Sequence, residues 1–257
     1  MYWHHPRESK LKNQIKLKRV LIKVSGEALA GNKEAPFNDA AIRQTAKRIA
    51  KLHAMGVEVA IVVGGGNIVR GRNIAPSRKT RPDADRAGMV GTMVNAKILG
   101  MALKSIDVPN RVISGIKMDE VAEPYIVGRA IRHLEKGRVV IFGGGLGLPF
   151  FTTDTTAVHR GRDIHVDAVL MAKYGTDGVY DCDPRSNPKA RRYRRVSYRD
   201  ALKRGLQVMD ATAVAMAEED NTLVIVFGAD SKTAMRDIVL GKSIGTIISK
   251  KKSAFAA

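Results

Sequence analysis

Short apolar runs alternate with helical patterns along the chain, and this alternation limits the fold more than any other feature. The runs "VLIKVSG" (20–26) and "VEVAIVV" (57–63) are typical of buried strands that end at or near glycines. Strands separated by helices predict βαβ crossovers, so we expect an α/β fold: a three-layer α/β/α sandwich with a mostly parallel central sheet. Further strands are expected at 111–114, 138–142, 167–172, 222–227 and 245–249, and helices at 39–56, 85–104, 123–135, 155–163, from 197 and after 231.

Length and cysteine content support a single domain that needs no covalent staples. The 257 residues can bury a sizeable core, and we expect one domain at 18–249 between a flexible basic extension (1–17) and a loose tail (250–257). Cys182 is the single cysteine, so an intramolecular disulfide and a cysteine metal cluster are excluded. No apolar run approaches the ~20 residues of a membrane span, and no export signal opens the chain, so a cytoplasmic protein is expected.

The charge balance points to anionic partners. Lys and Arg number 44 against 25 Asp and Glu, a formal net charge of +19, which favours polyanions or phosphorylated small molecules. Basic residues crowd 7–19 and 185–195, but neither segment carries the series of aromatic residues that stacks nucleic-acid bases. We therefore interpret both segments as solvated basic surface and do not expect a nucleic-acid groove.

Turns after the expected strands are where ligands should bind, because open α/β sheets hold ligands beyond the carboxyl ends of their strands. The first turn, "KVSGEAL", places Lys23 inside an apolar strand and Ser25 and Gly26 in the turn. A lysine is costly to bury without an anion, so a phosphate is a natural partner. The alternative is that Lys23 lies near the strand end and extends to water.

The second turn, "GGGNIVR" (64–70), matches neither common nucleotide signature. It lacks the spacing of G-x-G-x-x-G, and G-x-x-x-x-G-K-[ST] occurs nowhere in the chain. Residues without side chains nevertheless let backbone N–H groups close around phosphate oxygens, and Arg70 could add a forked cation. The alternative is an ordinary tight turn.

The third turn lies in "FGGGLGLPFFTTDTT" (142–156), where glycines are followed by threonine hydroxyls and Asp154. Such groups suit ribose, base and phosphate recognition, although a Gly-Pro loop with a helix cap would look similar. Taken together, three turns edged by Lys23, Arg70 and Asp154 favour a phosphotransfer cleft. The six histidines are scattered without metal-ligand spacing, so no protein metal site is predicted.

Several segments, in order, resemble bacterial uridylate (UMP) kinases of the amino-acid kinase superfamily. They are "KVSGEAL", "GGGNIVRG", "AEPYIVGRAIRHLEKGRVVIF", "PFFTTDT", "DGVYDCDP" and "VMDATA". The resemblance implies the amino-acid kinase fold and Mg²⁺-dependent phosphoryl transfer from ATP to UMP in pyrimidine nucleotide synthesis. It also implies an allosteric homohexamer, with GTP as activator and UTP as inhibitor. Here "GNKEAPFN" follows the first strand, where many relatives have a glycine-rich turn.

The resemblance also implies site residues by position. Lys23, Arg70 and Asp154 are expected to be catalytic: Lys23 and Arg70 contact the phosphates at the transfer point, and Asp154 orients Lys23. The implied ATP site comprises Lys23, Val24, Ser25, Gly26, Gly66, Arg70, Lys173, Tyr180 and Asp183. The implied UMP site comprises Gly65, Asp85, Leu146, Gly147, Leu148, Pro149, Phe150, Phe151, Thr152 and Thr153.

Two other functions are compatible with parts of the sequence. A related kinase could act on a carboxylate or carbamate, which "PFFTTD" argues against. The +19 charge would also suit a nucleic-acid-binding or regulatory protein whose kinase cleft is secondary. Salt separates these functions, because binding to a polyanion weakens steeply with ionic strength and binding in an enclosed nucleotide site weakens much less.

Overall fold

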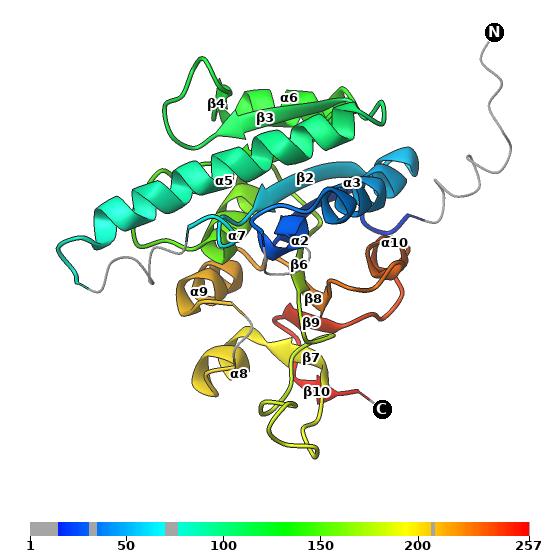
Figure 1. Ribbon diagram of the computed structural model, residues 1–257. Coiled ribbons are helices and arrows are strands. Elements are labelled where there is room, and N and C mark those ends of the chain that lie inside the picture. The colour runs from blue at the N-terminus through cyan, green and yellow to red at the C-terminus, as the bar shows by residue number, and fades with distance from the viewer. Residues whose placement is uncertain (1–14, 31–34, 70–76, 207–208, 257) are drawn as a thin grey trace, which may run out of the picture.

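The computed structural model describes residues 15–30, 35–69, 77–206 and 209–256. Within these residues a ten-stranded sheet has the order β10-β7-β9-β8-β6-β1-β2-β5-β3-β4 (Figure 1). Its strands are β1 (Arg19–Val24), β2 (Glu58–Val63), β3 (Asn110–Ser114), β4 (Glu123–Pro124), β5 (Val139–Gly143), β6 (Ala168–Lys173), β7 (Tyr193–Ser197), β8 (Val224–Gly228), β9 (Thr246–Ser249) and β10 (Ala254–Phe255). Neighbouring strands pair in parallel except β9 with β8 and β10 with β7, so the predicted mostly parallel sheet is confirmed.

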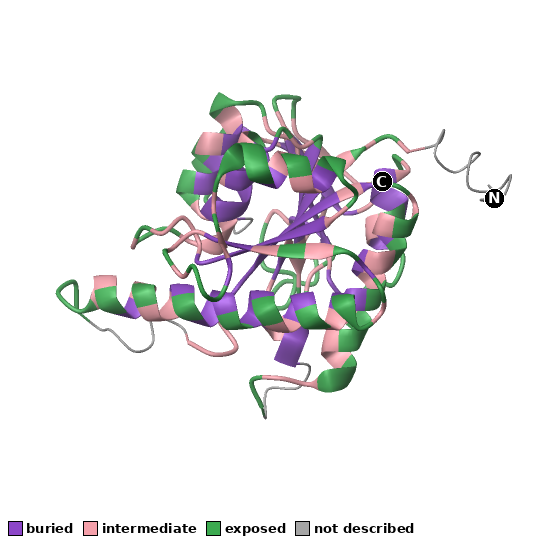
Figure 2. Cartoon of the chain, turned by 90° about the horizontal axis from the view of Figure 1, so that it is seen from above, coloured by how far each residue is buried: buried purple, intermediate pink, exposed green. Residues whose placement is uncertain are grey.

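Helices cover both faces of the sheet, as the alternation of apolar side chains requires. In β1, Val20, Ile22 and Val24 pack on the side of α3, α5 and α10, whereas Leu21 packs on the side of α6, α7 and α9. Figure 2 shows the resulting three layers, with buried residues in the sheet and exposed residues on the outer helix surfaces. The helices are α2 (Glu27–Ala30), α3 (Asp39–Ala54), α5 (Arg81–Lys104), α6 (Val127–Glu135), α7 (Thr153–Asp163), α8 (Tyr198–Lys203), α9 (Ala211–Glu219) and α10 (Ala234–Val239).

Strand order brings four turns to one edge of the sheet. β1 lies between β2 and β6, and β5 lies beyond β2, with all four strands parallel. The chain builds outward from β1 to β2, β3 and β5, and then returns to the other side of β1 as β6. The position beside β1 is therefore the switch point where ligands bind in open α/β sheets.

Three local features of the structure were not predicted. Asn38 caps α3: its backbone is extended (φ −135°), and its side chain accepts a hydrogen bond from Ala41 N at 3.0 Å. β7 forms where no strand was expected, because its arginine-rich segment hid the strand pattern. α9 was not predicted, although its N-cap Asp210 accepts from Ala213 N at 2.9 Å.

The two ends of the described chain are attached to the domain. Ile15 and Leu17, within the segment expected to be a flexible extension, pack against the α3 side of the core, and Lys16 N donates to Val239 O at 2.8 Å. Ala254–Phe255, within the segment expected to be a loose tail, forms β10. None of the helices in the described ranges is long and apolar enough to cross a membrane.

Candidate functional site

Three charged side chains meet at the carboxyl edge of the sheet beside β1. Lys23 alternates with Ile22 and Val24, so its side chain points to the face that α7 covers. There Lys23 Nζ lies 2.9 Å from Asp154 Oδ1, and Lys173 Nζ, at the end of β6, lies 3.3 Å from Asp154 Oδ2. The side chains of Lys23 and Asp154 are only 13% and 14% exposed. The strand lysine is therefore paired with an anion of the protein and does not extend to water.

The charges of this trio attract a further anion. Burial alone would raise the pKa of Asp154, but the positive charges of Lys23 and Lys173 outweigh it and hold the pKa below its usual value. The carboxylate is consequently ionised at neutral pH. Two ammonium groups and one carboxylate leave one positive charge at the switch point, which is suited to a phosphate.

Glycines allow the first two turns to approach each other closely. Gly64 N donates to Val24 O at 2.8 Å, which joins the ends of β1 and β2. A β-carbon added to Gly26 would lie 2.2 Å from Asn67 Oδ1, and one added to Gly65 would lie 2.9 Å from Gly88 O on α5. Larger residues would push these turns apart, so here glycine is required by packing as well as by any ligand.

A pair of asparagines fixes the glycine triplet from behind. Asn95, fully buried on α5, donates from Nδ2 to Gly64 O at 2.6 Å and to Asn67 Oδ1 at 2.7 Å. Asn67 Nδ2 in turn donates to Asn95 Oδ1 at 3.2 Å and to Pro36 O at 2.7 Å. Sequence reasoning missed this pair. An amide among the apolar positions of a buried helix face was the available signal, because buried polar groups need partners.

A cavity of about 140 Å³ lies between the glycine triplet, α5 and the loop after β5. Among the residues expected to bind UMP, those that line it are Gly65, Asp85, Leu146, Leu148, Phe151, Thr152 and Thr153. Gly147, Pro149 and Phe150 belong to the same loop but do not line the cavity. We call this the acceptor-side cavity. Asp85 ties its walls together, because Oδ2 accepts from Phe150 N at 2.8 Å and Oδ1 accepts from Arg81 Nε at 2.7 Å.

The loop after β5 is held at several points. Gly147 has φ +78°, and a β-carbon there would lie 2.4 Å from Gly115 O, so only glycine fits. Thr92 Oγ1 accepts from Gly144 N at 2.7 Å. Thr152 caps α7 by accepting from Asp154 N at 3.1 Å, and its hydroxyl donates to Asp210. These bonds place Asp154 relative to the loop.

A second cavity of about 320 Å³ is formed by residues 174–185 that follow β6, together with Arg204, Gly205 and Leu206. We call it the donor-side cavity, after the ATP site that the sequence resemblance implies, because Tyr180 and Asp183 of that implied site line it. Tyr180 OH donates to Asp177 Oδ1 at 2.8 Å, which, with partial desolvation, raises the pKa of Tyr180. Lys173, expected near adenosine, does not line it and lies on Asp154 instead.

The remaining expected residues fall in or beside the turns. Val24, Ser25 and Gly26 form the end of β1 and the turn into α2, where Leu29 N donates to Gly26 O at 3.0 Å. Gly66 lies in the turn after β2. Arg70 lies outside the described residues. In the described ranges, no three His, Cys, Asp or Glu side chains are grouped to hold a metal ion.

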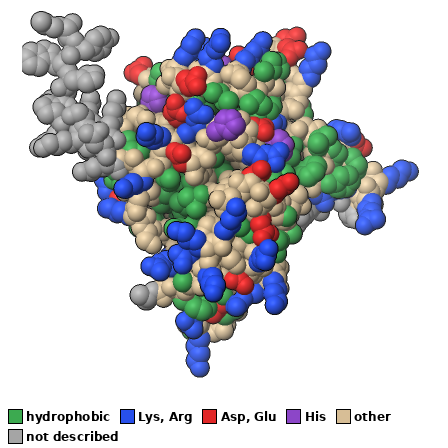
Figure 3. Space-filling view, turned by 180° about the vertical axis from the view of Figure 1, so that it is seen from behind, with side chains coloured by type: hydrophobic (Ala, Val, Ile, Leu, Met, Phe, Trp, Pro, Cys, Tyr) green, Lys and Arg blue, Asp and Glu red, His purple; other side chains and the backbone are tan. Residues whose placement is uncertain are grey.

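Basic side chains are spread over the surface. Figure 3 shows Lys and Arg across the face seen from behind, with Asp and Glu among them. Several of the basic residues are paired, for example Arg162 with Asp220 at 2.9 Å and Arg199 with Glu218 at 3.3 Å. This distribution is typical of a solvated surface.

Known proteins share this architecture. The model of the amino acid kinase family matches residues 18–228. A crystal structure of UMP kinase from Bacillus anthracis is 42% identical, with a TM-score of 0.91, and the match covers 94% of this chain and 99% of that one. A crystal structure of UMP kinase from Ureaplasma parvum is 37% identical, with a TM-score of 0.85, and covers 92% of this chain and 100% of that one.

Proposed function

Because the chain belongs to the amino acid kinase family and is similar over most of its length to two solved UMP kinases, we propose that it phosphorylates UMP with ATP. The products are ADP and UDP, which serve pyrimidine nucleotide synthesis. The observation that carries the proposal is one charged trio next to two cavities. Asp154 directly follows Thr153 of the acceptor-side cavity, and Lys173 directly precedes Tyr174 of the donor-side cavity.

The chemistry needs alignment and positive charge rather than a base. A phosphate oxygen of UMP, already ionised at neutral pH, attacks the γ-phosphorus of ATP while the bond to the β-bridging oxygen breaks and ADP leaves. Lys23 contacts the transferring group, and Asp154 holds its ammonium at that point. Lys173 adds a second positive charge from β6. Arg70 keeps its role, proposed from sequence, of contacting the phosphates at the transfer point.

Mg²⁺ enters as part of the donor substrate, bound to phosphate oxygens of ATP, where it neutralises charge. Each oxygen of Asp154 already faces a lysine, which leaves this carboxylate to orient cations of the protein. Ser25 and Gly26 directly follow β1, which carries Lys23, and Gly66 lies in the turn after the neighbouring strand β2. Their backbone N–H groups are therefore assigned to the ATP phosphates. Tyr180 and Asp183 contact adenosine from the donor-side cavity.

UMP binds in the acceptor-side cavity. Asp85 faces this cavity as an acceptor for ribose hydroxyls, and Thr152 and Thr153 offer hydroxyl groups. Leu146 and Leu148 line this cavity, so their side chains would contact the pyrimidine without hydrogen bonds. Leu148 and Phe151 are exposed apolar groups that UMP would partly cover.

Assembly and regulation extend the proposal. We propose a homohexamer that GTP activates and UTP inhibits, in the cytoplasm, in which residues 18–249 form the amino-acid kinase domain and the described residues on either side are attached to it. Support for self-association comes from an exposed apolar stripe on α5, formed by Val90, Val94 and Met101. A reducing compartment suits a chain with one cysteine.

The test is a coupled assay of ADP release with ATP and Mg²⁺, in which UMP, CMP, aspartate, glutamate and carbamate are offered in parallel. We expect turnover with UMP well above turnover with every other acceptor. Absence of turnover with UMP, from protein that is folded by circular dichroism, would overturn the proposal. Turnover with a carboxylate or carbamate instead would assign the cleft to another kinase of the family.

A further inference from the structure

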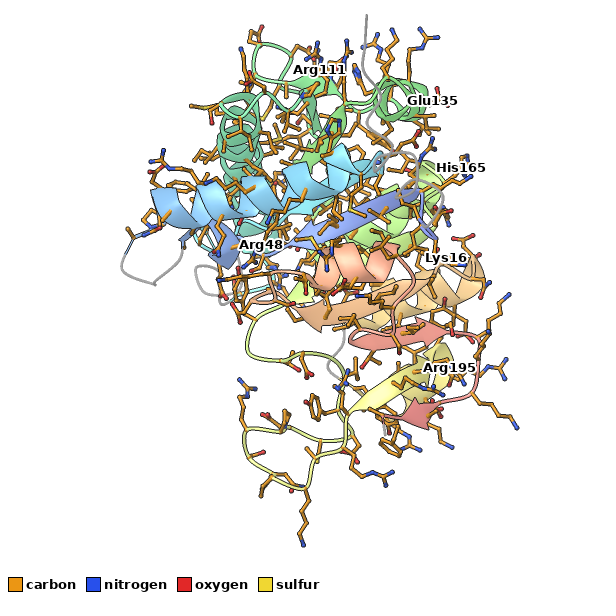
Figure 4. All side chains as sticks on the ribbon, turned by 90° about the vertical axis from the view of Figure 1, so that its right-hand side faces the viewer. Lys16, Arg48, Arg111, Glu135, His165 and Arg195 are labelled. Carbon is orange, nitrogen blue, oxygen red and sulfur yellow. The ribbon has the colours of Figure 1, made fainter. Side chains whose placement is uncertain are left out.

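The C-terminal residues of the described chain are bound along β7. We call residues 252–256 the C-terminal strap. β10 pairs antiparallel with β7, with Ala254 opposite Arg195 and Phe255 opposite Tyr193. Figure 1 shows β10 beside β7 at the end of the sheet, and Figure 4 labels Arg195 where β7 meets the last strands. The family model ends at residue 228, so the strap lies outside the matched segment.

Hydrogen bonds anchor the strap at both of its ends. Arg195 Nε donates to Lys252 O at 2.9 Å, and Ala256 N donates to Arg192 O at 2.8 Å. Ser253 Oγ accepts from Ser197 N at 3.0 Å and donates to the carboxylate of Asp200 at the start of α8. The strap thus supplies hydrogen-bond partners to β7, whose backbone N–H and C=O groups would otherwise face solvent at the edge of the sheet.

Ring packing adds an apolar contact. The Phe255 ring stacks on the buried Tyr193 ring, with centroids 4.4 Å apart and planes at 17°. The Cζ atom of the Arg191 guanidinium lies over the Phe255 ring, 3.8 Å from the ring centroid. Stacked rings, and cations placed over rings, each stabilise the fold by more than the burial of their apolar area alone. Phe255 is therefore the main anchor of the strap.

β7 also contacts residues that line the donor-side cavity. Tyr193 N donates to Val179 O at 2.8 Å, and Tyr193 OH accepts from Arg204 Nη1 at 3.0 Å. Val179 and Arg204 both line the cavity, as does Tyr180, which forms a β-bridge with Arg192. The same Tyr193 side chain therefore contacts the strap on one side and a cavity-lining residue on the other.

We propose that the C-terminal strap is a positioning element for the donor nucleotide. By packing Phe255 on Tyr193, it holds β7, and through Tyr193 it holds Val179 and Arg204 at the wall of the donor-side cavity. The acceptor-side cavity shares none of these contacts. The strap therefore acts on donor binding and leaves acceptor binding unchanged. This inference rests on the proposed function only in naming the donor as ATP.

The test separates the two substrates kinetically. We expect Phe255→Ala to raise the KM for ATP by about tenfold, with the KM for UMP and kcat changed by less than about twofold. Phe255→Tyr keeps the stacked ring and should behave as wild type. Lys251→Ala is the matched control, because its side chain is exposed and its hydrogen bond to Ser249 uses the backbone N–H.

A second readout does not depend on activity. Cys182, the single cysteine, is exposed and lines the donor-side cavity, where its Sγ lies 3.3 Å from Asn187 Nδ2. Its rate of reaction with a thiol reagent reports on the order of this wall. We expect Phe255→Ala to speed the reaction several-fold, and a non-hydrolysable ATP analogue to slow it in wild type.

These experiments test the role of the strap independently of the proposed UMP kinase activity. An unchanged KM for ATP and an unchanged Cys182 rate in folded Phe255→Ala would overturn it, and so would equal rises in both KM values. If Phe255→Ala does not fold, Ser253→Ala, which removes only the hydroxyl bonds to Ser197 and Asp200, is expected to show the same pattern more weakly. If UMP is not phosphorylated at all, the Cys182 rates and the affinity for the ATP analogue still test the strap.

Discussion

The two cavities are built in different ways. The acceptor-side cavity is fixed by buried polar side chains within the main sandwich: Asn95 on the glycine triplet, Thr92 on Gly144 and Thr152 at the start of α7. The donor-side cavity is formed by an excursion between β6 and β7 whose polar residues, such as Asp183 and Arg185, are exposed. In the proposed assignment, recognition of the acceptor is thus tied to the stability of the core, whereas recognition of the donor depends on a peripheral element.

The ion pairs at the two cavities also differ in burial. The acceptor side has one partly buried ion pair, Arg81 with Asp85, which organises the loop after β5. The donor side has an exposed pair, Arg185 with Asp183 at 3.0 Å, and exposed ion pairs contribute little to stability. The comparison predicts that changes on the acceptor side alter stability and activity together, and that changes on the donor side alter nucleotide affinity alone.

The largest expected effect lies where the two regions meet. Lys23→Ala removes the ammonium that is paired with Asp154 and proposed to contact the transferring group. It should lower kcat by about 10²–10³ or more, because one electrostatic contact at a transition state is worth that much. The measurement is steady-state ADP release at saturating ATP and UMP. Lys47→Ala, at an exposed position on α3, is the control and should keep wild-type activity. Full activity of Lys23→Ala would disprove its assignment.

An intermediate effect is expected from the asparagine pair, Asn67 and Asn95, that holds the glycine triplet. Asn95→Ala leaves Gly64 O and the Asn67 amide without their partner, which should cost about 1–3 kcal/mol of unfolding free energy. The kcat/KM values for both substrates should fall as well, because Gly65 lines the acceptor-side cavity and Gly66 is proposed to contact the ATP phosphates. Urea unfolding measures the first quantity, and initial rates measure the second.

The donor-side counterpart sharpens this prediction. Asn187→Ala removes an exposed amide and should change the unfolding free energy by less than about 0.5 kcal/mol. If Asn187→Ala destabilised the protein as much as Asn95→Ala, the contrast between a core-built and a peripheral site would be wrong.

The smallest expected effect concerns pH. The pKa of Asp154 is held below its usual value in the folded protein, so its ion pairs stabilise the fold above that value and are lost as pH falls through the folded pKa. Asp154→Asn should therefore be less stable than wild type at pH 7, and the difference should shrink below about pH 4. Urea unfolding at pH 7 and pH 3 tests this. A difference that is constant or grows in acid would contradict the assigned pairing.

The sequence predicted the parts of the structure that depend on local periodicity. Alternating strands and helices were enough for the three-layer sandwich. The lysine inside an apolar strand predicted a phosphate partner, and in the structure Lys23 is paired with Asp154 of the protein itself. Long-range pairings were not predictable. The bond between Asn67 and Asn95 and the stacking of Phe255 on Tyr193 join residues far apart in the chain, and no local pattern encodes them. The pairing of Lys173 with Asp154 was not predicted for the same reason, since the two residues lie on different elements.

The most direct test of the account is a titration of each nucleotide, UMP and a non-hydrolysable ATP analogue, against one variant on each side. Asp85→Ala alters the acceptor-side cavity and Tyr180→Ala the donor-side cavity. We predict that Asp85→Ala weakens UMP binding by about tenfold or more with the ATP analogue unchanged, and that Tyr180→Ala does the reverse. Equal loss of both nucleotides in either variant, or no loss in both, would contradict two separate sites that meet at Lys23 and Asp154.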